Sequence, residues 1–451
     1  MIERLGRISL SRPKVCLIHV GHMANKGTQA LLMSDVSTIR SIVKNGVAIC
    51  VSTVDVEGVK RLGLSLEAVL SPFVDIPYEK ADSYAKRLGI GRDSFKYKLR
   101  ALASLIFVLG QVMSIVFSAC LVKLGLGALH RADTLKHMKE SDLVVSCSDE
   151  NFKESSSLLP VSPRWIMTWW SMLVPRTMAV LVARFLGKHV VMFPNSIGPF
   201  RTRIGRFLSR LALNQCDYIL IREPVSFKIA ESLKVRSPKI LTSDTALLFS
   251  ADHEPPVEDF PKPVLGVCPG VYSNTLSETG IREYVQAHAK ALDKAVEEYG
   301  FHVVFLPHYV TGFRHDDLEI SKLIVGQMRH ADRARIVNVK TAGQFKALIN
   351  KLDLLVSSKM HPAVMAASAY VPTVYVAYDH KQVGFFSSLG VDDGIVSISE
   401  VSYERLLGRI DYVWRRKDAV QSLLKARVPV LQESTRRSIE RVLSVYVDVN
   451  S

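Results

Sequence analysis

The sequence predicts an α/β protein with two Rossmann-like domains that face a cleft. Three observations support this prediction: apolar, strand-like segments alternate with helical segments, a stretch rich in Pro and acidic residues interrupts the alternation, and the alternation then resumes. Continuous apolar strands that alternate with helices are typical of a parallel sheet covered by helices on both faces. The 451 residues are enough for two or three domains, each with its own core.

The first half of the chain contains this alternation from its start. Residues 14–20 (KVCLIHV) are expected to form a buried strand that ends at Gly21, and a helical pattern over about 28–43 follows a polar loop. Residues 47–53 predict a second strand, followed by another helical stretch. Further strands are expected at 143–146, 189–193 and 217–221.

The second half repeats the pattern after an interdomain linker. The linker is predicted at 251–263 (ADHEPPVEDFPKP), where Pro and acidic residues cluster. A strand at 264–268 and a helix at 281–299 follow, and further strands are expected at 302–307, 334–339, 352–357 and 373–377. We therefore predict an N-terminal domain over 1–255 and a C-terminal domain over 262–451. This is the architecture of GT-B-like, two-domain glycosyltransferases, although a fold does not by itself specify chemistry.

Two apolar stretches interrupt this plan. Residues 101–122 contain no charged residue, and a helix of this length would span about 33 Å, enough to cross a bilayer. The strands expected before and after it belong to one sheet, which a bilayer cannot divide. We therefore predict an apolar helical insert in the first domain, near 101–128. The second stretch, 165–183, is broken by Pro175 and Arg176 and contains Trp165, Trp169 and Trp170.

Two interpretations of the segment 101–122 stay open. In one, the helix lies in or dips into the membrane interface, which basic flanks and interfacial-type tryptophans favour. In the other, the helix is buried in the enlarged first domain or at a subunit contact. The basic flanks are Arg92, Lys96, Lys98, Arg100, Lys123 and Arg131. Loss of the protein from the membrane pellet on deletion of 101–122 would favour the first interpretation.

Composition and charge narrow the class of partner. Hydrophobic residues make up 48% of the chain and charged residues 22%, which excludes a disordered or fibrous protein. The net charge of +15 favours anionic partners, such as a phosphorylated metabolite, acidic lipid headgroups or a polyanionic glycan. The basic residues are spread along the chain and no nucleic-acid-binding motif is present, so we expect no nucleic acid partner.

The cysteines indicate a reducing compartment. All six are isolated, without a CxxC pair or a His cluster at metal-binding spacing, so we expect neither disulfides nor a metal site. The N-terminal segment MIERLGRISLSRPK lacks the apolar core of a signal peptide. We therefore expect a cytoplasmic protein, and peripheral contact with the inner face of the membrane stays open.

Three segments of the first half could carry chemistry. Asn25 and Gly27 open the helix after the first strand, where free N–H groups suit a phosphate or carboxylate, although a simple helix N-cap explains them as well. Ser196 lies after a later strand, at the edge where open α/β sheets bind ligands. Arg222 directly follows the strand 217–221 and could hold a carboxylate or phosphate, with a structural ion pair as the alternative.

Three strand ends of the second half carry histidines and lysines. His308 ends the strand 302–307, Lys359 and His361 open a helix after the strand 352–357, and Lys381 follows the strand 373–377. Histidine is the natural proton donor near neutral pH, and nearby cations would strengthen binding of an anion. Because parallel strands present their carboxyl ends at one edge, we expect these side chains to converge on a small anionic substrate.

Taken in order, these segments resemble the polysaccharide pyruvyl transferase family. The matching pieces of the first half are NKGTQALL, SDLVVSCSDENF, NSIGPF, CDYILIRE and SDTALLF, which contains Asp244. Those of the second half are FLPHYVTG with the following DD, SSKMHPAVMAAS, VPTVYVAYDHK and GFFSSLG. They cover the chain from residue 14 to about 390 in family order, and the apolar segment 101–122 lies outside them.

The resemblance implies transfer of a pyruvyl group from phosphoenolpyruvate to a sugar of a polysaccharide or lipid-linked glycan precursor, usually as a cyclic ketal. It implies no cofactor and no metal, since phosphoenolpyruvate is itself the donor substrate. The family's Arg-x-His motif corresponds to Lys359-Met360-His361, which makes His361 the expected acid. Arg222 matches the family arginine and is expected to act on the phosphate or carboxylate. The expected substrate-binding residues are Lys359, Lys381, His308, Asn25, Gly27, Ser196 and Asp244.

The sequence departs from the family pattern at three points. Lys359 replaces the usual arginine and offers a point charge instead of a planar fork. Thr28 occupies a usually acidic position, and residues 146–149 (SCSD) replace a glycine-rich run. Two other functions therefore stay open: a GT-B-type glycosyltransferase that uses a nucleotide-sugar, and a catalytically silent protein that binds a glycan or a membrane surface.

Overall fold

The structure is a computed structural model that describes residues 12–44, 46–73, 95–126, 132–154, 163–251, 257–271, 276–312 and 315–449. Side chains are not described for 95–105, 107–108, 132, 163–172 and 380. The predicted roles of Arg92, Arg131 and part of the linker therefore lie outside the described residues, as do the side chains of Lys96, Lys98, Arg100 and the three tryptophans of 165–183.

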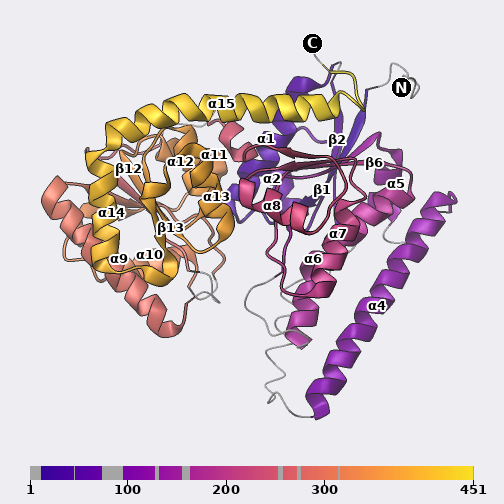
Figure 1. Cartoon of the computed structure of the whole chain (residues 1–451), viewed down its shortest axis with the longest axis horizontal. Coiled ribbons are helices and arrows are strands. Elements are labelled where there is room, and N and C mark those ends of the chain that lie inside the picture. The colour runs from indigo at the N-terminus through magenta and orange to yellow at the C-terminus, as the bar shows by residue number, and fades with distance from the viewer. Residues whose placement is uncertain are drawn as a thin grey trace.

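Two parallel sheets form the framework in the described part of the chain (Figure 1). The first has eight strands, in the order β3-β2-β1-β4-β6-β7-β8, with β5 paired to β6. These strands are β1 (Lys14–Val20), β2 (Ala48–Thr53), β3 (Ala68–Leu70), β4 (Leu143–Ser146), β5 (Asp149–Phe152), β6 (His189–Ile197), β7 (Tyr218–Ile221) and β8 (Lys239–Leu241). The order runs outward from β1 in both directions, so its topological switch point lies between β1 and β4.

The second sheet has six strands in the order β11-β10-β9-β12-β13-β14, which is the same winding. Its strands are β9 (Val264–Cys268), β10 (His302–Phe305), β11 (Ala334–Ile336), β12 (Leu354–Ser357), β13 (Thr373–Ala377) and β14 (Ile395–Ser397). Its switch point lies between β9 and β12. The prediction of two parallel, Rossmann-like α/β units is confirmed, and the exact domain boundaries at 255 and 262 stay a prediction.

Helices cover both faces of each sheet. Those that accompany the first sheet are α1 (Lys26–Ile42), α2 (Val56–Arg61), α4 (Phe95–Lys123), α5 (Ala132–Glu140), α6 (Pro163–Phe185), α7 (Arg203–Leu213) and α8 (Pro224–Ser232). Those of the second are α9 (Glu278–Tyr299), α10 (Asp317–Val325), α11 (Ala342–Ile349), α12 (Met360–Ser368), α13 (His380–Leu389) and α14 (Tyr403–Arg415). The side chains between sheet and helices form continuous apolar cores, as expected for strands buried on both faces.

The last helix, α15 (Lys417–Leu443), runs along both units (Figure 1). Near its start, Leu424 and Val428 pack into the core of the second unit. Near its end, Ile439 and Val442 pack into the core around β1 and β2. Because one helix contributes to a core in each unit, it fixes the two units relative to each other.

The apolar segment 101–122 lies within α4, which packs beside α6 and, in Figure 1, projects with it from the first unit. The second apolar stretch lies within α6, which continues through Pro175. In the described residues, no helix combines the length and the apolar character needed to cross a bilayer. The six cysteines carry free thiols.

Candidate active site

The two switch points face each other, because the loops that follow β1 and β10 are joined directly. Asn25 forms an isolated antiparallel bridge with Tyr309. The side chain of Lys26 donates to the carbonyl oxygens of Pro307 and His308, at 3.1 and 3.2 Å. Carboxyl ends of parallel strands are where open α/β sheets bind ligands. The site predicted from the strand ends of both halves is therefore one continuous region.

Two imidazoles lie at the centre of this region. His361 lies in the first turn of α12, and its ring is stacked on that of His308 with 6.2 Å between centroids. Both rings are buried, and within the described ranges the Nε2 atom of each has no hydrogen-bond partner. A buried ring nitrogen without a partner carries a desolvation cost, so these two atoms mark the place where a polar ligand would bind.

The imidazole of His361 rests against the first turn of α1. A Cβ atom added to Gly27 would lie 2.1 Å from its Nδ1, so only glycine permits this approach. The amide of Gly27 donates to Asn25 Oδ1 at 2.9 Å, which makes Asn25 the N-cap of α1. The alternative that Asn25 and Gly27 form a simple helix N-cap thus describes their contacts. The amide of Gly27 already has Asn25 Oδ1 as its hydrogen-bond acceptor. Their expected contact with substrate stays a prediction.

The surroundings of both histidines favour the neutral imidazole. Burial lowers the pKa of His361; Arg222 and Lys381 act in the same direction, while Asp244 and Asp149 oppose them. Burial also lowers the pKa of His308, together with the neighbouring charges of His361, Lys26 and Lys359. An anion bound between the rings would reverse part of both effects, because a nearby negative charge favours the protonated form.

Lys359 is held in place by a carboxylate of the second unit. Its Nζ lies 2.9 Å from Asp317 Oδ1, and both side chains are buried. Asp317 Oδ2 in turn accepts from the backbone amides of His308 and Tyr309. Close packing on Gly270, where a Cβ would lie 2.0 Å from Lys359 Cε, fixes the lysine stem. Lys359 is therefore a positioned cation beside the histidines, already paired with one acid.

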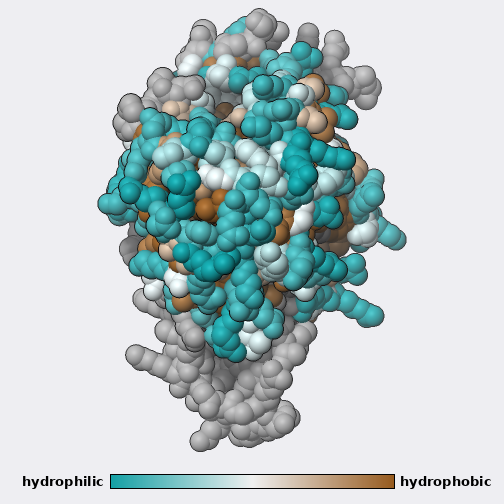
Figure 2. Space-filling model, turned by 90° about the vertical axis from the view of Figure 1, so that its left-hand side faces the viewer, coloured by the Kyte–Doolittle hydropathy of each residue, from teal (hydrophilic) through white to brown (hydrophobic). Residues whose placement is uncertain are grey.

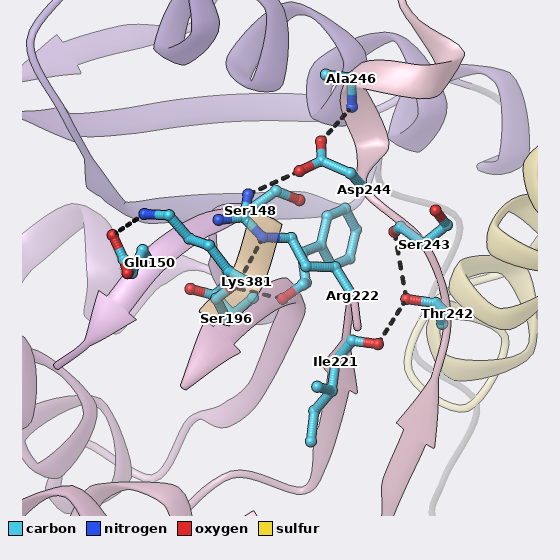
Figure 3. Close-up of polar contacts among 12 residues, drawn as sticks. Ser148, Glu150, Ser196, Ile221, Arg222, Thr242, Ser243, Asp244, Ala246 and Lys381 are labelled. Carbon is cyan, nitrogen blue, oxygen red and sulfur yellow. Dashed lines mark hydrogen bonds and ion pairs between the residues drawn. The ribbon is translucent and has the colours of Figure 1, made fainter. Parts of the chain in front are cut away.

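Arg222, Ser196 and Asp244 form one buried cluster (Figure 3), and the charges of Asp244 and Arg222 are close enough to act on the pKa of His361. Arg222 Nη1 lies 2.7 Å from Asp244 Oδ2, and Arg222 Nε donates to Ser196 Oγ at 2.8 Å. The neighbouring acid in the sequence, Glu223, is not this partner and caps α8. The contacts of Arg222 therefore match the alternative of a structural ion pair, in which Asp244 is the partner carboxylate. Direct contact of Arg222 with substrate stays a prediction.

Lys381 connects the two units across the same region (Figure 3). Its Nζ forms an ion pair with Glu150 at the end of the first sheet and lies 3.8 Å from Asp379 Oδ2. Burial raises the pKa of Glu150, but Lys153 and Lys381 outweigh this and hold the pKa well below its usual range. Glu150 is thus an ionised carboxylate, and its buried Oε1 has no hydrogen-bond partner in the part of the chain that the structure describes.

Three residues that sequence reasoning did not single out belong to this site. Lys26 is buried beside Phe345, and burial lowers its pKa. Glu150 supplies the free oxygen described above. Arg176 of α6 has a buried Nη1 that no other described residue contacts through a hydrogen bond. Burial lowers the pKa of Arg176, while the carboxylates of Asp149 and Glu150 raise it. The available signal was that Lys26 and Glu150 lie in the segments that follow β1 and β4, which were already noted for other residues.

No group of three or more His, Cys, Asp or Glu side chains in the described ranges is arranged to hold a metal ion. The convergent groups are instead imidazoles, buried lysines and a buried, ionised carboxylate. Such a set binds anions, donates a proton and accepts hydrogen bonds from hydroxyl groups.

Two Rossmann-like units with facing switch points define a GT-B-like protein. Solved structures with this fold include UDP-GlcNAc 2-epimerase from Neisseria meningitidis bound to UDP-GlcNAc, at 11% identity and a TM-score of 0.58, covering 96% of this chain and 100% of that chain. Another is HepE from Anabaena in complex with UDP-glucose, at 11% identity and a TM-score of 0.53, covering 95% of this chain and 99% of that chain. At such identities the likeness shows the fold alone.

Within this class, the chain belongs to the polysaccharide pyruvyl transferase family, whose model matches residues 66–380. The family makes the protein a transferase enzyme. A curated relative, the amylovoran biosynthesis protein AmsJ from Erwinia amylovora, is 19% identical over 248 residues. The match covers 52% of this chain and 60% of AmsJ, so the chain spans less than two thirds of that relative.

Proposed function

We propose that this enzyme transfers the pyruvyl group of phosphoenolpyruvate to two hydroxyl groups of a sugar, forming a cyclic ketal. One observation carries the proposal. Two stacked imidazoles, His308 and His361, each have a buried Nε2 that finds no partner among the described residues, beside a buried lysine, Lys26. This combination suits a small anion that must also be protonated.

The donor would bind between Lys26 and the two histidines. Lys26 donates to backbone carbonyl oxygens, and in the described part of the chain it forms no ion pair. A buried ammonium without a counter-ion is destabilised by desolvation, as its lowered pKa reflects. A carboxylate or phosphate would supply the missing negative charge. Lys359, which is paired with Asp317, and Arg222, which is paired with Asp244, would contribute little net positive charge to the donor site.

The reaction balances with His361 as the acid. His361 would give a proton to C3 of phosphoenolpyruvate, which leaves C2 as an oxocarbenium-like centre. One sugar hydroxyl forms a bond to C2, the bond between C2 and the phosphate oxygen breaks, and the second hydroxyl closes the ring. Two hydroxyl protons are released: one restores the acid, and the other leaves with the phosphate. Positioned acids of this kind contribute about 10²- to 10⁴-fold to rates.

The acceptor would approach from the first unit. The free Oε1 of Glu150 can accept a hydrogen bond from a sugar hydroxyl, and Arg176 Nη1 can donate one. Both groups lie where a polar, uncharged ligand would satisfy them. The name of AmsJ, an amylovoran biosynthesis protein, supports an acceptor of the polysaccharide class. We propose a polysaccharide or lipid-linked glycan precursor, modified in the cytoplasm at the inner face of the membrane.

The donor proposal is tested by thermal stabilisation of the full chain. We expect phosphoenolpyruvate to raise the melting temperature in a concentration-dependent manner, because a ligand that binds the folded state stabilises it. Inorganic phosphate and a panel of nucleotide-sugars serve as comparisons. Incubation with phosphoenolpyruvate and a glycan acceptor should release phosphate and add a pyruvyl ketal to the acceptor, detected by mass spectrometry.

The substitution Lys26→Met is expected to remove the shift with phosphoenolpyruvate. Lys346→Met is the matched control, because Lys346 is a buried lysine that donates to the carbonyl oxygen of Met365 and to Ser368, outside the histidine pair. If a nucleotide-sugar and not phosphoenolpyruvate raises the melting temperature, the proposal is overturned in favour of a glycosyltransferase. Several UDP-binding proteins share this fold. No shift with any ligand would favour a silent binding protein.

A further inference from the structure

Helix α4 has two opposite apolar faces, and only one of them is covered. Ile115, Ala119 and Val122 are at most 5% exposed and pack into the core of the first unit. On the other side, Leu109, Met113 and Phe117 are 56%, 68% and 60% exposed. Residues advance by about 100° each around a helix, so these two sets lie on opposite sides. We call the uncovered side the α4 face; its members are Ile106, Leu109, Met113, Val116, Phe117 and Leu124.

A surface helix of a globular protein normally presents polar residues to water on this side. The α4 face instead presents six large apolar side chains in one continuous stripe. By contrast, the end of the molecule formed by α9, α10 and α14 is predominantly hydrophilic (Figure 2). An uncovered apolar stripe of this length indicates an interaction surface.

The charge around the stripe identifies its partner. The sequences of α4 and α6, which pack beside each other, contain seven basic residues and no acidic residue. The basic residues are Lys96, Lys98, Arg100, Lys123, Arg164, Arg176 and Arg184. Apolar residues combined with basic ones are typical of helices that lie in the interface of an anionic bilayer. In a two-fold contact with a second copy, the same positive charges would repel each other.

We propose that the α4 face docks on an anionic lipid surface, with α4 lying in the plane of the headgroups. The apolar side chains enter the boundary between headgroups and acyl chains, and the positive charge of α4, whose sequence has four basic residues and no acidic one, attracts the anionic headgroups. Docking in this way does not require a helix that crosses the bilayer. It requires only that one side of α4 is covered by protein and the other by lipid.

The docked orientation also explains how an anchored acceptor reaches the cleft, a part of the inference that rests on the proposed function. Helix α6 runs beside α4 and carries Arg176, which is close enough to Asp149 and Glu150 for their charges to act on its pKa. One helix therefore connects the lipid-facing surface with the acceptor side of the site. A glycan attached to a membrane lipid would enter along α6.

Vesicle flotation of the full chain tests the docking. We expect the protein to float with vesicles of equal parts phosphatidylglycerol and phosphatidylcholine, and much less with phosphatidylcholine alone. The triple variant Leu109→Gln, Met113→Gln, Phe117→Gln should lower the partition coefficient at least about ten-fold, because interfacial binding scales with the apolar area inserted. The matched control removes three exposed apolar side chains elsewhere, with Leu323→Gln, Val430→Gln and Val445→Gln, and should float like the unmodified chain.

Three results would overturn the proposal: absence of flotation with anionic vesicles, undiminished flotation of the triple variant, or a dimer in light scattering that the triple variant dissociates. Circular dichroism checks folding, and Phe117→Gln alone replaces the triple variant if that variant unfolds. Activity on a water-soluble glycan acceptor separates the two proposals. The triple variant should retain this activity, so a failure of docking and a failure of the transferase function give different results.

Discussion

The ends of β4 and β12 occupy corresponding places in the two sheets, each beside the first strand at a switch point, yet the chain continues differently from each. After β4 it enters another strand, β5, which carries Asp149 and Glu150. After β12 it turns directly into α12, which presents Lys359 as its N-cap and His361 in its first turn. One strand end therefore supplies carboxylates, and the other supplies an ammonium group and an imidazole.

This difference indicates a division of labour between the two strand ends. An imidazole beside buried lysines can bind an anion and give it a proton, which suits the donor. An ionised carboxylate can accept a hydrogen bond from a hydroxyl group, which suits the sugar. The ion pair between Glu150 and Lys381, which follows the neighbouring strand β13, joins the two units beside these strand ends. Neither end contains both kinds of group, so the site is complete only where the two units meet.

The largest effect is expected from His361, at the β12 end. His361→Asn should lower kcat by about 10²- to 10⁴-fold, while stabilisation by phosphoenolpyruvate persists. His288→Asn is the control, because His288 is also buried with an Nε2 that lacks a partner, but lies in α9 outside the histidine pair. It should leave kcat nearly unchanged. Wild-type turnover by His361→Asn would remove this residue from the mechanism.

The pH dependence of the rate also tests the assignment of His361 as the acid. Burial lowers the pKa of His361 below its ordinary value of 6.5, so the protonated acid becomes more abundant as the pH falls. We expect kcat/KM for phosphoenolpyruvate to rise between about pH 8 and about pH 6, and the rise to be absent from His361→Asn. A bound anion raises the pKa, so the corresponding change in kcat should occur at higher pH than that in kcat/KM. A flat profile would contradict acid catalysis by His361.

A smaller effect is expected at the β4 end. Glu150→Gln should raise KM for the acceptor by about ten-fold, because a hydrogen bond to a charged group is replaced by one to a neutral amide. KM for phosphoenolpyruvate should stay unchanged. Glu223→Gln is the control, since Glu223 is a buried carboxylate that caps α8. Equal increases of both KM values would show that Glu150 only positions Lys381 and does not contact the sugar.

The sequence predicted the parts of this comparison that depend on local pattern. The strands around 143–146 and 352–357 are apolar runs, so they and the residues that follow them could be located. The largely apolar strands β3, β8 and β14 were missed because three residues are too few to form a pattern, and β5 was missed because its sequence, DENF, is not apolar. Such a strand forms because its backbone pairs with β6, and the sequence of one strand does not contain that information.

The contacts that join the two units could not be predicted, because they depend on tertiary packing. Lys381 and Glu150 are 231 positions apart, and Lys26 contacts backbone 281 positions away. The resemblance to the family located Arg222 and Asp244 separately, but only the structure shows that they neutralise each other. Likewise, hydropathy predicted an apolar helix over 101–122, but which of its faces is covered depends on how α4 packs against its neighbours.

The smallest effect on activity is expected from Asp35, which holds the loop after β4. Its carboxylate accepts from the amide and the hydroxyl of Ser148, both at 2.8 Å, and burial raises its pKa from 3.8 to about 7. Between these values the folded state binds more protons than the unfolded state, so stability falls as pH rises from about 4 to about 7. This pKa shift corresponds to a decrease in the free energy of unfolding on the order of 4 kcal/mol over this pH range. Asp35→Asn should flatten this slope in thermal melts, and an unchanged slope would contradict the assignment; Asp293→Asn controls for loss of a buried acid.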